Sequence, residues 1–440
     1  MNSRLEQTTS VWMQLGVISS PASLSKDVGT DVCVVGAGIS GMTTAYLLLR
    51  EGKSVVVLDD GPIGGGQTQR TTAHLTNAID DRYIHIEDWH GYEGMRMAAE
   101  SHTAAIDRIE AIVNEEKIEC EFERLDGYLV GSSSESLEIL QQELQAARRA
   151  GLSQIELIPH CPLREFNTVP CLRFPRQGQF HPLKYLTGLK QAVQRMGGLI
   201  ITQTRVEKIE SGPPAIIHTY LGPTVTAHSV VVATNSPFND FVTIHTKQAA
   251  NISYVLGFEV PKGSVTKALY WDLESPYHYV RLQPLSESES SGELLIVGGE
   301  DHKTGQANDA DDRYGRIEEW TRKRFPASGK ILYRWSGQVL ETIDGLAFIG
   351  RNPLDGQNVY IATGDSGQGM THGTIAGILL TDLILERENP WSTLYDPSRK
   401  TIRAAGRYLK ENLNVAAQYT TWMTGGDVGS TQSIALGTGA

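Results

Sequence analysis

Three glycines near the N-terminus have the spacing of a phosphate-binding loop. Gly36, Gly38 and Gly41 form a Gly-x-Gly-x-x-Gly motif between an apolar run at residues 31–35 and a helix expected directly after it. The first glycine of such a motif allows a tight turn, the second lets the backbone approach a pyrophosphate, and the third lets the helix and the strand lie close together. The pyrophosphate then faces the positive end of the helix.

An acidic residue is expected about 20 positions further on, where it binds a ribose hydroxyl. Asp59 follows Gly41 at about this spacing, at the end of the apolar run 54–58, and Asp60 follows it. This order of elements predicts a dinucleotide site: a strand, the glycine loop, a helix, a second strand and the acidic residue. The alternative is a glycine turn of an α/β fold that binds no ligand.

A second glycine-rich loop occurs late in the chain, at residues 363–373. It follows an apolar run at 358–362 and precedes a helix expected at 374–385. A helix N-terminus aimed at a ligand stabilises negative charge, and a reduced flavin carries such charge at its pyrimidine edge. The second loop therefore favours FAD over a nicotinamide dinucleotide, with a plain strand-to-helix turn as the alternative.

Two phenols and a guanidinium alternate along one expected strand. Tyr277, Tyr279 and Arg281 are two residues apart, so a strand would place all three side chains on one face. A guanidinium flanked by aromatic side chains suits a substrate carboxylate, which it can bind through two hydrogen bonds. The alternative is a surface or core-edge arginine paired with an acid such as Glu300.

These motifs resemble those of the FAD-dependent D-amino-acid oxidase and glycine oxidase superfamily. Four segments carry the resemblance, residues 31–59, 64–75, 335–345 and 363–373. Bacterial flavin oxidoreductases that continue into a C-terminal Rieske iron–sulfur domain share three more, residues 9–13, 70–74 and 298–302. The Cys-x-His-type ligands of a Rieske domain do not occur in the sequence, and Asp59 stands where a glutamate is commoner.

The resemblance implies two-electron oxidation of a C–N bond in an amine or amino acid. It places Arg281, Tyr279, Tyr277 and His74 in the substrate site. It also places the loop Gly66–Thr72, called the flavin-side loop below, beside the flavin ring. Some relatives attach FAD through a histidine near this loop, but the matching position is closer to Arg70, so we expect non-covalent FAD. His74 then either lines the site or is a plain hydrogen-bonded histidine. The residues expected to bind FAD are Gly36, Gly38, Ile39, Ser40, Gly41, Asp59, Asp60, Gly66, Gln67, Thr68, Arg70, Thr71, Thr72, Val206, Ala233, Thr234, Gly364, Gly367, Gln368, Gly369, Met370 and Thr371.

Three other functions remain open at this stage. The chain could be a flavin-bearing electron-transfer subunit whose acceptor is an iron–sulfur domain or protein. It could oxidise a hydroxyl group instead of an amine. It could be a serine hydrolase, because His74 and Ser366 lie in short strings that mimic those around a catalytic His and Ser.

The expected fold class is α/β (α+β). A discontinuous Rossmann-like FAD-binding domain carries an inserted antiparallel sheet that forms the substrate domain. An arm at 1–28 covers either its own domain or another subunit, so the oligomeric state is left open. The expected division is FAD domain at 29–105, 170–246 and 336–397, substrate domain at 106–169 and 247–335, and a C-terminal helix with a linker-like tail at 398–440.

Composition limits the partners. The 440 residues carry a formal charge of −12, which argues against binding to nucleic acid. The four cysteines have no metal-binding or disulfide spacing, so we expect neither a metal site nor a disulfide framework. No signal peptide or membrane-spanning segment is recognisable, which favours a cytoplasmic protein that acts on a small molecule and not at a membrane.

Overall fold

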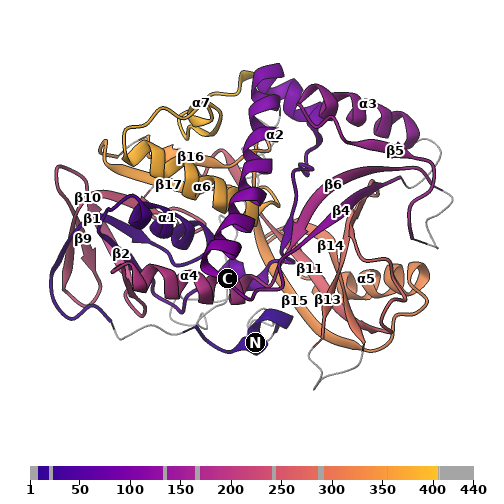
Figure 1. Cartoon of the computed structure of the whole chain (residues 1–440), viewed down its shortest axis with the longest axis horizontal. Coiled ribbons are helices and arrows are strands. Elements are labelled where there is room, and N and C mark those ends of the chain that lie inside the picture. Colours follow the sequence, from indigo (N-terminus) through magenta and orange to yellow (C-terminus); the bar gives the residue numbers. More distant parts are fainter. Residues whose placement is uncertain are drawn as a thin grey trace, which may run out of the picture.

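Two β-sheets lie side by side, and the long helix α2 (Arg82–Glu116) runs between them (Figure 1). The computed structural model describes residues 8–18, 23–131, 136–163, 169–239, 244–285, 292–353, 355–404 and 406. The expected tail at 398–440 therefore lies mostly outside the described residues. None of the described helices is both long and apolar enough to cross a membrane.

The first sheet has a parallel centre with the strand order β16-β17-β10-β1-β2-β7. Its β1 strand is buried on both faces over Val32–Val35, as a near-continuous apolar run predicts for a parallel sheet. The antiparallel pair β8–β9 extends it beside β10. Its strands are β1 (Val28–Val35), β2 (Val55–Leu58), β7 (Leu199–Ile201), β8 (Val206–Glu210), β9 (Ala215–Thr219), β10 (Thr224–Val232), β16 (Phe348–Arg351) and β17 (Val359–Thr363).

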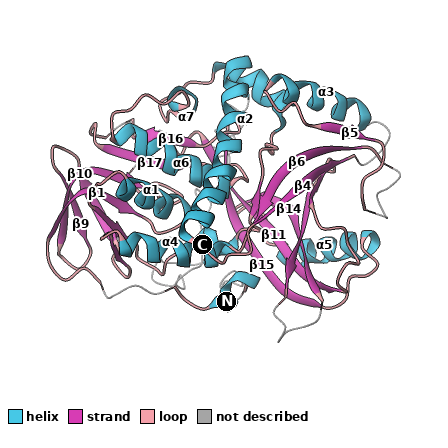
Figure 2. Ribbon diagram, in the orientation of Figure 1, coloured by secondary structure: helices cyan, strands magenta, loops and turns pink. Residues whose placement is uncertain are grey.

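Helices α1 (Ile39–Arg50), α4 (Pro182–Arg195) and α6 (Gly369–Ile384) accompany this sheet (Figure 2). Two glycines of α6 let it approach α1 closely. A Cβ atom at Gly373 would lie 2.7 Å from a side-chain carbon of Ile39, and one at Gly377 would lie 2.6 Å from a side-chain carbon of Thr43. Because Ile39 begins α1 and Gly373 lies one turn into α6, the N-terminal parts of the two helices are held next to each other.

The second sheet has the strand order β15-β11-β14-β13-β12-β4-β6-β3, with β5 beside β6. Its neighbouring strands are antiparallel, as expected, except for the parallel pair β12–β4. Helix α5 (Ala310–Arg324) packs on β11 and β14, and α3 (Ser136–Arg149) contacts α2. Its strands are β3 (His74–Leu75), β4 (Glu123–Val130), β5 (Glu156–Ile158), β6 (Cys171–Gln179), β11 (Gln248–Val260), β12 (Leu269–Asp272), β13 (His278–Pro284), β14 (Glu293–Lys303) and β15 (Ile331–Thr342).

The chain passes between the sheets several times, which agrees with the expected α/β class and the discontinuous first domain. Strand pairing shifts some of the expected boundaries. Strand β6 pairs with β4 in the second sheet, although 170–246 was assigned to the FAD domain. Strand β15 continues past the expected boundary at 335. An apolar run shows that a strand is buried but not which partner it pairs with, and this is why the boundaries were misplaced.

The N-terminal arm packs on its own chain. Its 3-10 turn η2 (Val11–Leu15) places Trp12 at 0% exposure, and the Trp12 indole N–H donates to the Thr71 carbonyl at 2.6 Å. The Ser10 hydroxyl donates to the Gln69 carbonyl at 2.6 Å. The arm therefore covers the outside of the segment that was expected to lie beside a flavin.

A buried ion pair fastens the C-terminal part of the described chain, next to α7 (Ser392–Tyr395) and η5 (Ile402–Ala404). Arg399 donates to both carboxylate oxygens of Asp344, at 2.8 and 2.6 Å, and the Asp344 side chain is 1% exposed. Burial alone would raise the pKa of Asp344, but the charge and hydrogen bonds of Arg399 hold it well below its usual value.

We expect Asp344→Asn to lower the free energy of unfolding by about 3 kcal/mol, because it leaves a buried guanidinium without its counter-charge. Urea denaturation measures this. Since the folded pKa lies below the unfolded value near 4, the contribution is complete above about pH 5 and is lost as the pH falls further. The control is Glu51→Gln, which breaks the exposed pair with Arg387 and should cost less than about 1 kcal/mol. Equal losses in the two variants would contradict this account.

Candidate active site

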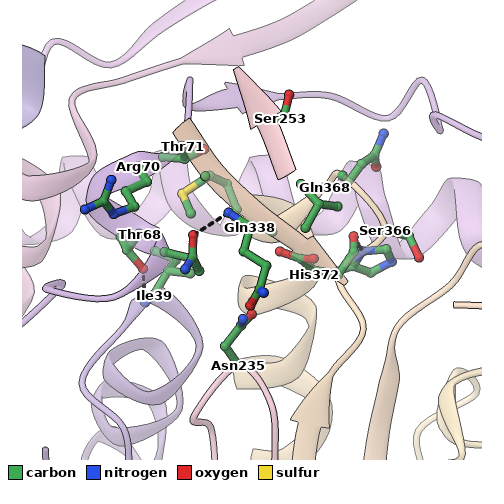
Figure 3. Close-up of a pocket in the computed structure, with 18 of the residues that line it drawn as sticks. Ile39, Thr68, Arg70, Thr71, Asn235, Ser253, Gln338, Ser366, Gln368 and His372 are labelled. Atoms are coloured by element: carbon green, nitrogen blue, oxygen red, sulfur yellow. Dashed lines mark hydrogen bonds between the residues drawn. The ribbon is translucent and has the colours of Figure 1, made fainter. Parts of the chain in front are cut away.

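A cavity of about 1680 Å³ opens between the two sheets (Figure 3). It exceeds the range of about 300–1,000 Å³ that is usual for a small-molecule pocket, so it has room for a dinucleotide together with a substrate. The cofactor residues expected from the sequence line it, except Gly41 and Thr371, and His74, Tyr277 and Tyr279 line it as well. Arg281 does not line it.

The first glycine loop has the shape that the sequence predicts. Gly36 has a φ of 110°, and a Cβ atom there would lie 2.4 Å from the carbonyl oxygen of Ala233. A Cβ atom at Gly41 would lie 1.9 Å from the carbonyl oxygen of Gly36. The N–H of Ile39 donates to the Thr68 hydroxyl at 3.1 Å, which joins the start of α1 to the flavin-side loop (Figure 3). The glycines thus open a backbone cradle that side chains would close.

Asp59 supports this loop directly. One carboxylate oxygen accepts from the N–H of Ala37 at 2.6 Å, and the other accepts from the N–H of Gly61 at 2.8 Å. Burial raises the pKa of Asp59, and these two N–H groups partly offset the rise. Asp59 and Asp60 both line the cavity at the end of β2. The acid that was expected to bind ribose therefore also fixes the phosphate loop.

The second glycine loop brings another helix N-terminus to the same cavity. Gly364 and Gly367 have φ values of 72° and 79°, and α6 begins at Gly369, which lines the cavity with Met370. The N-termini of α1 and α6 consequently border one space. This pair of positive helix ends suits a ligand that carries a pyrophosphate and a second, electron-rich group.

The flavin-side loop is tied to the second sheet. Its turn η3 (Gln67–Arg70) is held against β15, where the N–H of Gln338 donates to the Gln67 side-chain oxygen at 2.8 Å. The Arg70 guanidinium donates to the Ser336 carbonyl at 3.1 Å, and the Trp335 indole donates to the Arg70 carbonyl at 3.0 Å. Figure 3 shows Arg70, Thr71 and Gln338 around this junction. The two sheets are thereby fixed relative to each other at the cavity.

The two predicted tyrosines form part of a polar network on the second sheet. The Tyr279 hydroxyl lies 2.8 Å from the Ser253 hydroxyl, and the Tyr277 hydroxyl donates to Asp301 at 3.2 Å. His74 lies edge-on to Tyr279, with 5.7 Å between the ring centroids. Burial and the nearby charge of Arg281 lower the pKa of His74 to about 3, so this histidine is neutral at pH 7.

Arg281 does not occupy the position expected for a carboxylate-binding residue. Its side chain is buried at 1% exposure, and its guanidinium donates at 3.0 Å to the carbonyls of both Thr72 and Ala73. It also lies 5.4 Å from the ring centroid of Trp12. Tyr279 and Arg281 do share a face of β13, but the long arginine side chain passes behind the flavin-side loop. Alternation along a strand predicts the face and not the direction of a long side chain.

Carboxylates were missed by the sequence reasoning. Asp80, Asp301, Glu341 and Asp365 all line the cavity. Asp301, Glu341 and Asp365 fall in segments that carried the resemblance but were given no role there, and Asp80 lies outside those segments. Asp272, Glu274 and His278 also place ligand atoms within 4.8 Å of one another, as a metal site would need. Glu274, however, already accepts from Arg324 and from the Trp320 indole.

The hydrolase alternative is not supported by the geometry. The Ser366 hydroxyl lies 3.1 Å from the Thr342 hydroxyl and accepts from the Thr342 N–H. His74 instead contacts Thr72, at 3.1 Å. Serine and histidine thus have separate partners, and no nucleophile–base pair forms between them.

A family model described as FAD dependent oxidoreductase matches residues 31–383. The chain belongs to this family. FAD is therefore its cofactor, and the family expected from the motifs is confirmed. The glycine cradle, the two helix N-termini and the size of the cavity independently fit this cofactor.

The chain is also similar to two curated bacterial proteins. It is 29% identical over 395 residues to the putative Rieske 2Fe-2S iron-sulfur protein YhfW of Bacillus subtilis, covering 90% of this chain and 76% of that protein. It is 29% identical over 376 residues to the gamma-glutamylputrescine oxidoreductase of Escherichia coli, covering 82% of this chain and 85% of that enzyme.

Among solved structures, the fold is similar to glycine oxidase from Geobacillus kaustophilus, with a TM-score of 0.70 and 16% identity over 85% of this chain and 99% of the other. L-proline dehydrogenase from P. horikoshii gives a TM-score of 0.69 and 18% identity, over 85% of this chain and 98% of the other. At this identity the likeness concerns the fold alone.

We expect Gly36→Ala to abolish FAD binding, because the new methyl group would collide with the Ala233 carbonyl at a φ that side chains rarely adopt. The measurement is the visible flavin absorption of the purified protein after incubation with FAD. Gly29→Ala is the matched control, since a Cβ atom there meets nothing within 4 Å. A yellow, FAD-loaded Gly36→Ala protein would contradict the placement of the pyrophosphate at this loop.

We expect Arg281→Met to destabilise the fold by about 3 kcal/mol, because it leaves buried carbonyls without their donor. Denaturant unfolding measures this loss. Arg322→Met, which removes an exposed arginine paired with Glu318, should cost less than about 1 kcal/mol. If Arg281 instead bound a substrate carboxylate, its replacement would raise KM for substrates that bear a carboxylate and leave stability unchanged.

Proposed function

We propose that the protein oxidises a C–N bond of an amine or amino acid, with transfer of a hydride from the substrate carbon to N5 of a non-covalently bound FAD. The observation that carries this proposal is the single cavity that joins the two glycine loops to the tyrosine pair on the second sheet. One end of this cavity fits a dinucleotide, and the other end is lined by aromatic and polar side chains from β11, β13 and β14. The name of one relative also supports C–N oxidation, because the Escherichia coli protein is named for an amine substrate.

FAD supplies the two-electron acceptor when it is bound. The N-termini of α1 and α6 provide positive potential for its pyrophosphate and for the electron-rich edge of its ring. Turn η3 and β15 hold the flavin-side loop in place through Gln67 and Arg70. The contribution of the chain is therefore to position the reactants and to provide fixed dipoles.

The reacting nitrogen must be neutral when the hydride leaves, because its lone pair forms the C=N bond. A substrate that enters as the ammonium ion has to lose one proton first. Neutral His74 and the neutral phenols of Tyr277 and Tyr279 offer an ammonium group no counter-charge, so loss of water around the nitrogen beside them favours the neutral amine. The imine product is then hydrolysed by water to a carbonyl compound and an amine or ammonia.

A second candidate concerns the electron acceptor. The Bacillus subtilis relative is named a Rieske iron–sulfur protein, and this chain covers 76% of it. An iron–sulfur domain or protein is therefore a candidate to receive electrons from the reduced flavin in place of oxygen. Reoxidation by oxygen and reoxidation by an iron–sulfur domain or protein would use the same flavin site. The two candidates differ only in what reoxidises the reduced protein.

We expect the purified holoprotein to release its flavin into the supernatant on acid precipitation and to lose its visible flavin absorption when a good substrate is added without oxygen. Amines and amino acids form the screen, and the corresponding alcohols serve as the control. Flavin that stays in the precipitate would contradict non-covalent binding. Bleaching by alcohols alone would refute C–N oxidation. Rapid recovery of the colour in air identifies oxygen as an acceptor, whereas slow recovery that an iron–sulfur protein accelerates supports the second candidate.

A further inference from the structure

Carboxylates from three separate elements meet in the cavity. Asp80 precedes α2, Asp301 lies on β14, and Glu341 lies on β15, and all three line the cavity. Asp80 is packed among protein atoms but keeps surface that is accessible to solvent, and it lines the cavity. Burial and the charges of Asp81, Asp301 and Glu341 raise the pKa of Asp80 to about 7. The three acids therefore act on the same small volume.

Two arginines of α5 that line the cavity near Asp301 are held by other acceptors. Arg313 donates to Asp309 at 2.8 Å and to the Glu300 carbonyl at 2.7 Å, and Arg316 donates to the Glu300 carboxylate at 2.6 Å. Arg281, the expected partner for a substrate carboxylate, is turned to backbone carbonyls behind the loop. The acids thus face the cavity beside two guanidinium groups of α5 that are held by other acceptors, and Arg82, two residues after Asp80, lines the cavity as well.

Aromatic rings complete this part of the wall. Tyr277 and Tyr279 are 5.8 Å apart between ring centroids, at 36° to each other, and the Tyr277 hydroxyl donates to Asp301. Burial, with Asp301 next in effect, raises the pKa of both phenols, so both rings stay neutral. Electron-rich aromatic faces next to carboxylates are the surroundings that bind an ammonium group, and they repel a substrate carboxylate.

We propose that Asp80, Asp301 and Glu341, together with Tyr277 and Tyr279, bind a second, protonated nitrogen of the substrate, so that the substrate class is a di- or polyamine and not an α-amino acid. This inference rests on the proposed C–N oxidation. The reacting nitrogen must be neutral, so the positive charge that these acids compensate belongs to another nitrogen of the same molecule. An α-amino acid would bring its carboxylate towards three acids, which like charges make unfavourable.

Three probes with the same four-carbon chain test the inference. They are 1,4-diaminobutane, n-butylamine and 4-aminobutanoate, which end in a second ammonium, a methyl group and a carboxylate. We expect half-maximal anaerobic bleaching of the flavin at a concentration at least ten-fold lower for the diamine than for butylamine, with 4-aminobutanoate weakest. The diamine should also raise the melting temperature of the holoprotein more than the other two, which reports binding without turnover.

Two variants test whether the acidic side chains cause the preference for the diamine. Asp301→Asn and Glu341→Gln keep the size of the side chains and remove their charge, and each should reduce the preference for the diamine at least ten-fold. Asp312→Asn, on the exposed face of α5, is the control and should leave the preference unchanged. The visible flavin spectrum of each variant shows that it has folded and holds FAD.

The outcomes separate the two proposals. Bleaching by butylamine or 4-aminobutanoate at the same or lower concentration than the diamine overturns the inference and leaves C–N oxidation standing. Absence of bleaching by any amine or amino acid overturns the proposed function. In that case a thermal shift specific to the diamine, lost in Asp301→Asn, still supports the cation-binding site, and equal shifts for the three probes refute it.

Discussion

The close approach of helices α1 and α6 is the constraint on which the rest of this structure depends. Gly373 and Gly377 leave room for the side chains of Ile39 and Thr43, because α6 itself contributes no side chain at these two contacts. Their first turns then lie together, although the helices are more than 300 residues apart in the chain. Two positive helix ends consequently border one cavity, and this arrangement makes a single extended anionic cofactor the natural occupant.

A second constraint is the junction between the two sheets. The flavin-side loop is bound to β15 through Gln67 and Arg70, it is covered from outside by Trp12, and it is supported from behind by Arg281. These contacts connect segments that are 59 to 271 residues apart. A cofactor held by the first sheet therefore has a fixed position relative to side chains on the second. Reactions that need short and well-oriented contacts depend on such rigidity.

The charge of the cavity differs from what family resemblance suggested. A strand with two tyrosines and an arginine suggests a carboxylate-binding site. The guanidinium of Arg281, however, donates its hydrogen bonds to the carbonyls of Thr72 and Ala73. The acids Asp80 and Asp301 remain on the cavity wall with raised pKa values. Family membership therefore predicts the cofactor loops, but it does not predict which charged side chains line the rest of the cavity.

The sequence by itself determined the cofactor loops and the class of fold. The first glycine loop is formed by Gly36, Gly38 and Gly41, which are only a few residues apart. Their spacing and local chemistry were therefore enough to predict it. Only the folded chain brings Asp80, Asp301 and Glu341 to one cavity, because they come from distant elements and share no local pattern. It also decided which sheet β6 joins and that Arg281 is a support for the loop. The physical reason is that a glycine turn depends on local backbone geometry, whereas the direction of a long side chain and the pairing of a strand depend on neighbours that only the folded chain supplies.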